Sequence, residues 1–132
     1  MSPPHAGGFY MAKIKITESE IQMQILAYLR SAGVFAFSVP NELLGKSQRS
    51  GGMSRMIKFR NMGLTSGVAD LICLLPGGRV FFLEVKTPAG RQSENQKAFE
   101  NRVTGLGFDY HIARSIEDAK KIMEDKQWKN LR

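Results

Sequence analysis

The sequence predicts an α/β fold in which helices flank a mixed central sheet, and two observations carry this prediction. Segments 68–75 and 79–86 are apolar on both faces, as expected for central strands that are covered on two sides. Amphipathic segments with helix-capping signals precede and follow them, which gives the order α-β-β-β-α-β-α. A chain of 132 residues with 42% apolar content has room for one such core.

The first helix and the first strand follow from capping and stop signals. Thr17-Glu18-Ser19-Glu20 has the form of a capping box and precedes apolar residues at helical spacing. Gly33 is expected to end this helix, and a strand over 34–39 is expected to end at Pro40. A short helix over 56–62 is the weakest of the predicted elements.

The carboxyl-terminal part alternates helix, strand and helix. Ser93 is the expected N-cap of a helix that connects two parallel strands, and Ser115 opens the last helix after a strand over 108–113. The residues of the Ser93 helix expected to face the sheet are Ala98, Phe99, Val103 and Leu106. Trp128 is expected to fix the carboxyl terminus. Residues 1–11 are expected to form a flexible tail, with Met11 a possible natural start, and 12–132 a single domain.

Two acidic residues and one lysine stand near the ends of the central strands. Glu84 and Lys86 lie on one face of the second apolar segment, because side chains alternate across a strand. If residues 76–78 form a three-residue hairpin loop, the register puts Asp70 opposite Glu84 on that same face. Opposed Cβ atoms lie about 4.5–5.5 Å apart, so both carboxylates could bind one divalent cation. A two-residue loop would turn them to opposite faces, and a buried Glu84–Lys86 ion pair is the alternative interpretation.

The distribution of charge indicates a polyanionic partner. The chain carries 19 basic and 12 acidic residues, for a formal net charge of +7. Residues 43–69 contain no acidic residue, and a basic loop is expected over about 41–66. A solvated loop would show the same composition, but the nearby acidic pair favours nucleic acid. The candidate phosphate contacts are Lys46, Arg49, Arg55, Lys58 and Arg60.

The remaining composition predicts a cytoplasmic protein. The single Cys73 excludes an internal disulfide framework and is expected to be an ordinary core residue. The two histidines show no spacing typical of zinc ligands. No apolar stretch is long enough for a membrane span, so no membrane partner is expected.

These motifs resemble a known nuclease superfamily. The order Glu20, Asp70, Glu84-Val85-Lys86 and Gln96 resembles the PD-(D/E)xK superfamily, and 67–70 with 82–86 resemble its VRR-NUC branch. The similarity covers roughly residues 17 to 113 and is strongest to small stand-alone members from bacteria and phages. It implies the restriction-endonuclease-like αβββαβ core and a bacterial or phage-infected cell as the setting. Ala69 replaces the usual proline before the aspartate, which removes a backbone constraint but no ligand.

The resemblance also implies roles for individual residues. Asp70 and Glu84 would bind Mg²⁺ or Mn²⁺, with the Val85 carbonyl as an additional ligand, and Lys86 would orient the attacking water and stabilise charge on the phosphate. Glu20 would be the helical acid, with Glu18 as its rival. Gln96 would support the water or Lys86, although it could equally fold back on Ser93 in a capping box. Arg91, in the loop between, is a further candidate phosphate contact.

The sequence thus predicts a divalent-metal-dependent DNA endonuclease. The resemblance implies a homodimer that acts on branched DNA such as four-way (Holliday) junctions. Two alternatives stay open, a nucleic-acid-binding module without catalysis and a partner-dependent subunit of a replication or repair assembly. Apolar residues in or beside the basic loop are candidates for the dimer surface. They are Phe35, Phe37, Leu43, Leu44, Met53 and Met56.

Overall fold

A computed structural model of the chain describes residues 15–40 and 52–126. Its helices and strands, in chain order, are α2 (Glu18–Ser31), β1 (Phe35–Ser38), α3 (Gly52–Asn61), β2 (Leu71–Leu75), β3 (Arg79–Val85), α4 (Glu94–Gly105), β4 (Asp109–Ala113) and α5 (Ile116–Lys126). The predicted order of elements is confirmed, with α3 inserted between the first two strands. The expectations for residues 1–11, for Trp128 and for Lys46, Arg49, Leu43 and Leu44 lie outside the described residues.

The four strands form one mixed sheet in the order β1-β2-β3-β4. β1 and β2 pair antiparallel, as do β2 and β3, whereas β3 and β4 run parallel. Parallel neighbours need a crossover connection, and α4 provides it, as the sequence predicts. β3 is therefore a central strand with a hydrogen-bonded neighbour on each side.

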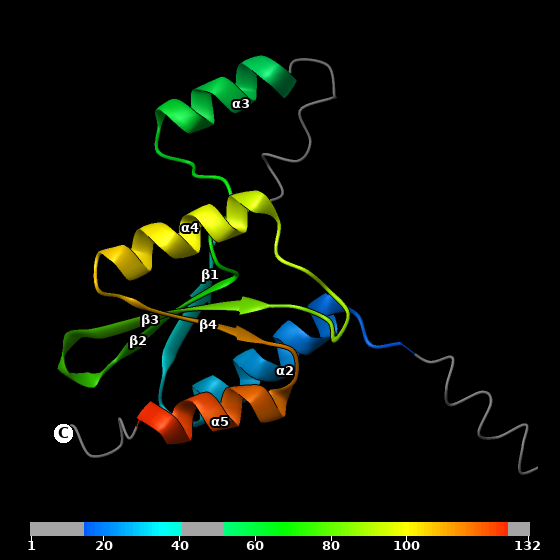
Figure 1. Cartoon of the computed structure of the whole chain (residues 1–132), viewed down its shortest axis with the longest axis vertical. Helices are drawn as coiled ribbons and strands as arrows, with labels where there is room; N and C mark the ends of the chain where they lie inside the picture. The colour runs from blue at the N-terminus through cyan, green and yellow to red at the C-terminus, as the bar shows by residue number, and fades with distance from the viewer. Residues whose placement is uncertain (1–14, 41–51, 127–132) are drawn as a thin grey trace, which may run out of the picture.

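The sheet is covered on both faces (Figure 1). α2 and α5 lie on one face and α4 on the other, with α3 beyond α4. A hydrophobic core cluster lies between the sheet and helices α2 and α5, where alternate β3 residues Phe81, Leu83 and Val85 are almost completely buried. Phe82 points to the opposite face, and its ring packs edge-on against Phe99 of α4 at 5.5 Å between centroids. β3 is thus apolar on both faces from Val80 to Leu83, before Glu84.

Capping residues fix where α2 and α4 begin. Thr17 caps α2 and Ser93 caps α4, each in a capping box with the glutamate or glutamine three residues later. Two inward-facing predictions for α4 were wrong. Ala98 turns to solvent because it lies about 100° around the helix from Phe99. Leu106 is 76% exposed, because it is the C-cap residue, where the helix ends.

The turn between β2 and β3 has the odd length that the chemistry requires. Pro76–Gly78 form a single 3₁₀ turn, and Leu75 pairs with Arg79. Gly77 and Gly78 have φ values of 78° and 72°, which glycine adopts without strain. Continuing the register from Leu71 opposite Leu83 puts Asp70 opposite Glu84. The predicted hairpin register, with Leu75 opposite Arg79, is confirmed.

Gly67 sets the path of the chain into Asp70. β2 begins at Leu71, three residues later than predicted, and the preceding segment packs against the amino-terminal end of α4. A Cβ atom on Gly67 would lie 2.2 Å from the Asn95 carbonyl oxygen and 2.8 Å from the Gln96 nitrogen. Its φ of +77° is also a conformation that other residues rarely adopt.

We expect Gly67→Ala to lower the free energy of unfolding by more than about 2 kcal/mol, because it combines backbone strain with a clash against backbone atoms. Gly63→Ala is the matched control, since φ is +108° there and nothing lies within 4 Å of the added Cβ. Gly63→Ala should lower the free energy of unfolding by about 1 kcal/mol. Urea unfolding of both variants measures the difference. Equal losses of unfolding free energy in the two variants would mean that the close contact of Gly67 with α4 is unimportant for stability.

Candidate active site

Asp70 is held in place by a backbone amide of the neighbouring strand. Its Oδ2 accepts a hydrogen bond of 2.7 Å from the Val85 nitrogen, just where the main-chain pairing of β2 and β3 ends. Burial raises the pKa of Asp70 to about 6, against the lowering effect of the Val85 amide. The charges of Glu18 and Glu84 raise this pKa further, and Lys86 lowers it. Asp70 therefore ionises only at a cost in the protein without metal.

Glu84 is completely buried, and its two oxygens have different surroundings. Oε1 accepts hydrogen bonds from Gln92 Nε2, at 2.9 Å, and from the Tyr110 hydroxyl. Oε2 has no hydrogen-bond partner among the described residues. Its neighbour is the Lys86 ammonium, with 3.5 Å between Nζ and Oε2. A buried oxygen of this kind is costly unless a further positive partner satisfies it.

Lys86 lies on the same face, two residues after Glu84, as the alternation predicts. The residue is 9% exposed, so its ammonium is largely removed from water. Its backbone nitrogen donates a 3.1 Å hydrogen bond to the Ala113 carbonyl, which extends the parallel pairing past the end of β3. The sheet therefore fixes the lysine at its base.

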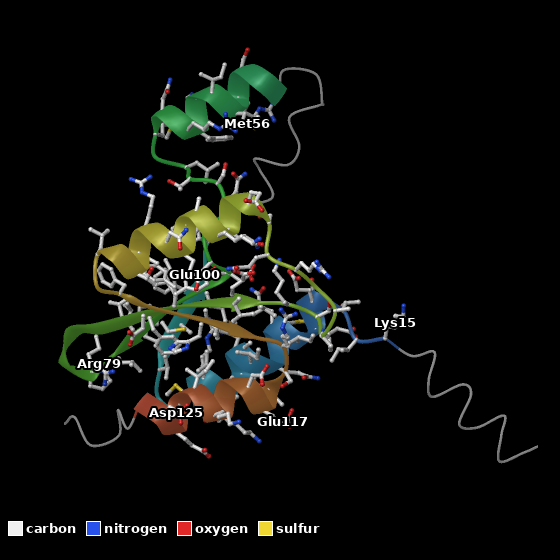
Figure 2. The ribbon with its side chains drawn as sticks, viewed as in Figure 1. Lys15, Met56, Arg79, Glu100, Glu117 and Asp125 are labelled. Atoms are coloured by element: carbon white, nitrogen blue, oxygen red, sulfur yellow. The ribbon has the colours of Figure 1, made fainter. Side chains whose placement is uncertain are left out.

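Gln92 and Tyr110 are site residues whose contacts the sequence did not reveal. Gln92 donates a second hydrogen bond, of 2.8 Å, to Glu100 Oε1. Glu100 lies on the side of α4 that faces the sheet (Figure 2). Burial raises the pKa of Tyr110 above its usual value, and so does its hydrogen bond to Glu84. The hydroxyl therefore stays protonated and donates a hydrogen bond to Glu84.

The structure uses Glu20 and Gln96 as capping residues. Glu20 Oε1 accepts from the Thr17 nitrogen at 2.8 Å and from the Thr17 hydroxyl at 2.9 Å, bonds that lower the pKa of this exposed carboxyl. Gln96 Oε1 accepts from the Ser93 nitrogen at 2.8 Å. Neither side chain has a described contact with the buried carboxylate or lysine. The helical acid whose charge acts on Asp70 is Glu18, the rival candidate.

The loop from Lys86 to Gln92 is held by Arg114, which sequence reasoning missed. Arg114 Nη1 donates to the carbonyls of Thr87 and Gly90, both at 2.7 Å, and to that of Pro88 at 3.3 Å. Its contacts are distant in sequence, so no local pattern marks it. The guanidinium therefore fixes the connection that brings Gln92 back to the end of β3.

The residues present fit a hard divalent cation. Within 15–40 and 52–126, no three His, Cys, Asp or Glu side chains form a ready cluster. Asp70 and Glu84 offer two carboxylates, and the Val85 carbonyl would be a third oxygen donor. Mg²⁺ is commonly held by one or two carboxylates, with waters and substrate phosphate completing its shell. The buried, unsatisfied Oε2 of Glu84 meets this requirement.

The basic residues predicted to contact phosphate have exposed side chains wherever the structure describes them. Arg55, Lys58 and Arg60 lie on α3, and Arg91 lies in the loop before α4. Figure 1 shows α3 on the far side of α4 from the sheet, so the three basic residues of α3 lie on the opposite side of the sheet from α5. No helix of the described segments is long and apolar enough to cross a membrane.

Comparison with known proteins identifies one family. The profile of the VRR-NUC domain matches residues 38–117. A solved structure described as a VRR_NUC domain is 20% identical, with a TM-score of 0.57, and the match covers 81% of this chain and 94% of the other. A VRR_NUC domain protein is 18% identical, with a TM-score of 0.64, covering 90% and 93%. At these low identities, the two structural matches show a shared fold. The search of curated proteins gave no match.

We expect Asp70→Asn to stabilise the metal-free protein near neutral pH, because it removes a carboxylate whose ionisation burial disfavours. The folded-state pKa of about 6 exceeds the usual 3.8, so the charged group destabilises the fold above about pH 6. That penalty fades as the pH falls towards about 4, where folded and unfolded states are both protonated. Thermal melting in EDTA across this range should show the two proteins converging at low pH.

The same variant should bind Mn²⁺ at least about tenfold more weakly in calorimetry, because an anionic ligand is lost. Asp125→Asn is the control, since this exposed residue lies on α5, across the sheet from α4 (Figure 2). It should change neither measurement. Unchanged Mn²⁺ affinity in Asp70→Asn would remove Asp70 from the site.

Proposed function

The chain belongs to the VRR-NUC family, a family of nuclease domains with the restriction-endonuclease-like fold, and we propose that it is a divalent-metal-dependent DNA endonuclease. The observation that carries this proposal is the completely buried Glu84, whose Oε2 lacks a hydrogen-bond partner in the described structure and lies beside Lys86. A buried carboxylate oxygen left open next to a lysine supports metal-assisted hydrolysis better than a purely structural role.

Each site residue has a distinct task in this proposal. Asp70, Glu84 and the Val85 carbonyl would hold Mg²⁺ or Mn²⁺. When bound, such an ion lowers the pKa of a water and neutralises charge on the phosphate. Lys86, fixed directly after β3, would donate a hydrogen bond to the attacking water or to the phosphate oxygens as negative charge develops there. Glu18, whose charge acts on Asp70, would contribute a further carboxylate from α2, in the role that the resemblance implies for Glu20 or Glu18.

The preferred substrate is proposed to be branched DNA, including four-way junctions. The resemblance to small stand-alone VRR-NUC proteins motivates this choice, and the net charge of +7 supports binding to a polyanion. Arg55, Lys58 and Arg60 would contact phosphates from α3, and Arg91 from the loop that follows Lys86. Such contacts position the nucleic acid and are insensitive to its sequence.

A homodimer would supply the two sites that symmetric cleavage of a junction needs. β1 is an edge strand, and its Phe35 is 65% exposed while its ring packs against Phe37 at 5.5 Å between centroids. This pair is the best described candidate for the shared surface. Met56, another candidate, is only 8% exposed and is therefore a weaker one.

We expect Lys86→Ala to reduce cleavage by at least about 100-fold while metal binding persists, because a group that stabilises the transition state is lost. Labelled duplex, flap and four-way-junction DNA, incubated with Mg²⁺, Mn²⁺ or EDTA, provide the assay. Lys97→Ala is the control, since Lys97 lies exposed on α4 in a surface pair with Glu94. Undiminished cleavage by Lys86→Ala would favour the binding module without catalysis, with Glu84 and Lys86 as a structural pair.

We expect Arg55→Ala/Lys58→Ala to weaken binding to all DNA sequences alike. The slope of log K against log salt should fall by about two, one released counterion for each lost phosphate contact. Lys120→Ala/Lys121→Ala removes the same charge from α5, on the other face of the sheet, and should leave the slope nearly unchanged. Equal slopes for the two double variants would mean that α3 makes no specific phosphate contact.

We expect light scattering at micromolar concentration to give about twice the 14.8 kDa chain mass. Phe35→Ser should shift the protein towards monomer by removing apolar contact area. Met23→Ser, at an apolar residue of α2 that is 63% exposed, is the control. A monomer that cuts both strands of a junction in one binding event would contradict the proposed dimer.

A further inference from the structure

The unequal surroundings of the Glu84 oxygens carry an inference about metal selectivity. A carboxylate oxygen has two lone pairs, and Oε1 accepts two hydrogen bonds, from Gln92 and from Tyr110. Both of its acceptor positions are therefore used. Oε2 accepts none from the described residues. Glu84 is thus prepared to offer one oxygen, and not two, to a cation.

Gln92 can hold this arrangement because its own orientation is fixed. Its amide nitrogen donates both hydrogens to carboxylate oxygens, to Glu84 at 2.9 Å and to Glu100 at 2.8 Å. Ionised carboxylates only accept hydrogen bonds, so a rotated amide would aim its oxygen at two acceptors and lose both bonds. Glu100 belongs to α4 and anchors the amide from outside the strand.

Tyr110 approaches Oε1 from a different element. It lies on β4 and pairs with Phe82, two residues before Glu84, so the parallel register places its side chain on the Glu84 face. Its ring packs against Phe99 of α4, with centroids 6.3 Å apart, which restrains the hydroxyl. β4 and the loop before α4 therefore each contribute one donor to the same oxygen.

We propose that Gln92 and Tyr110 are positioning residues that restrict Glu84 to one-oxygen metal binding and so make the site select Mg²⁺ over Ca²⁺. This inference rests on the proposed function. Ca²⁺ takes six to eight oxygens and often binds both oxygens of a carboxylate, whereas Mg²⁺ needs a smaller, octahedral set and retains waters. Occupying Oε1 removes a ligand that Ca²⁺ would use and Mg²⁺ does not need.

The test compares calorimetric affinities for MgCl₂ and CaCl₂ in the full chain and in the variants Gln92→Met, Tyr110→Phe and Glu100→Ala. Gln92→Met keeps the length of the side chain but has no donor, and Tyr110→Phe removes only the hydroxyl. Mg²⁺ should bind about tenfold more weakly to each of these two, while Ca²⁺ binds equally or more tightly. Glu100→Ala, which loosens Gln92 without touching Glu84, should shift the ratio of affinities in the same direction by less.

Tyr28→Phe is the matched control, because it removes a tyrosine hydroxyl from α2 and should leave both affinities unchanged. Melting curves in EDTA establish which variants are folded. If Tyr110→Phe does not fold, the Mg²⁺ and Ca²⁺ affinities of Gln92→Met in the loop and of Glu100→Ala on α4 still test the inference. A fall of Mg²⁺ and Ca²⁺ affinity by the same factor would overturn the inference and leave the metal site standing. An original protein that binds neither ion would overturn the metal site itself.

Discussion

The burial of Glu84 is the constraint on which the rest of the site depends. A carboxylate without access to water must be compensated from within the protein, and here three elements contribute to that. Tyr110 from β4 and Gln92 from the loop between β3 and α4 donate hydrogen bonds to one oxygen, and the Lys86 ammonium lies near the other. The hydrogen bonds from Arg114 to the carbonyls of Thr87 and Gly90 also help to compensate Glu84, because they hold the loop that carries Gln92.

Much of this could be predicted from sequence because it depends on local rules. Capping boxes at Thr17 and Ser93 involve residues three apart, and strand alternation places Glu84 with Lys86. Predicting that Asp70 lies opposite Glu84 required only the length of one turn. The fold class followed from the order of such elements, and the family profile agrees with the motif-based resemblance.

The rest depended on geometry that spacing along the chain does not encode. Tyr110 reaches Glu84 only through the parallel register of β3 and β4, and α4 separates these strands in sequence. The capping box at Thr17 engages Glu20, but the effect of the Glu18 charge on Asp70 depends on how α2 packs against the sheet. Gln96 satisfied two patterns at once, a family motif and a capping box. The short-range hydrogen bond to Ser93 is the one that formed.

The three-residue turn at Pro76–Gly78 also limits how this protein can change during evolution or engineering. Because neighbouring residues on a strand point to opposite faces, inserting or deleting one residue there would separate Asp70 from Glu84 while leaving both strands able to pair. Inserting or deleting two residues in the turn would keep Asp70 and Glu84 on the same face of the sheet. Loop exposure, the usual guide to tolerance of insertions, is therefore misleading at this site. An exposed turn about one strand length from the site can therefore change its length only by an even number of residues.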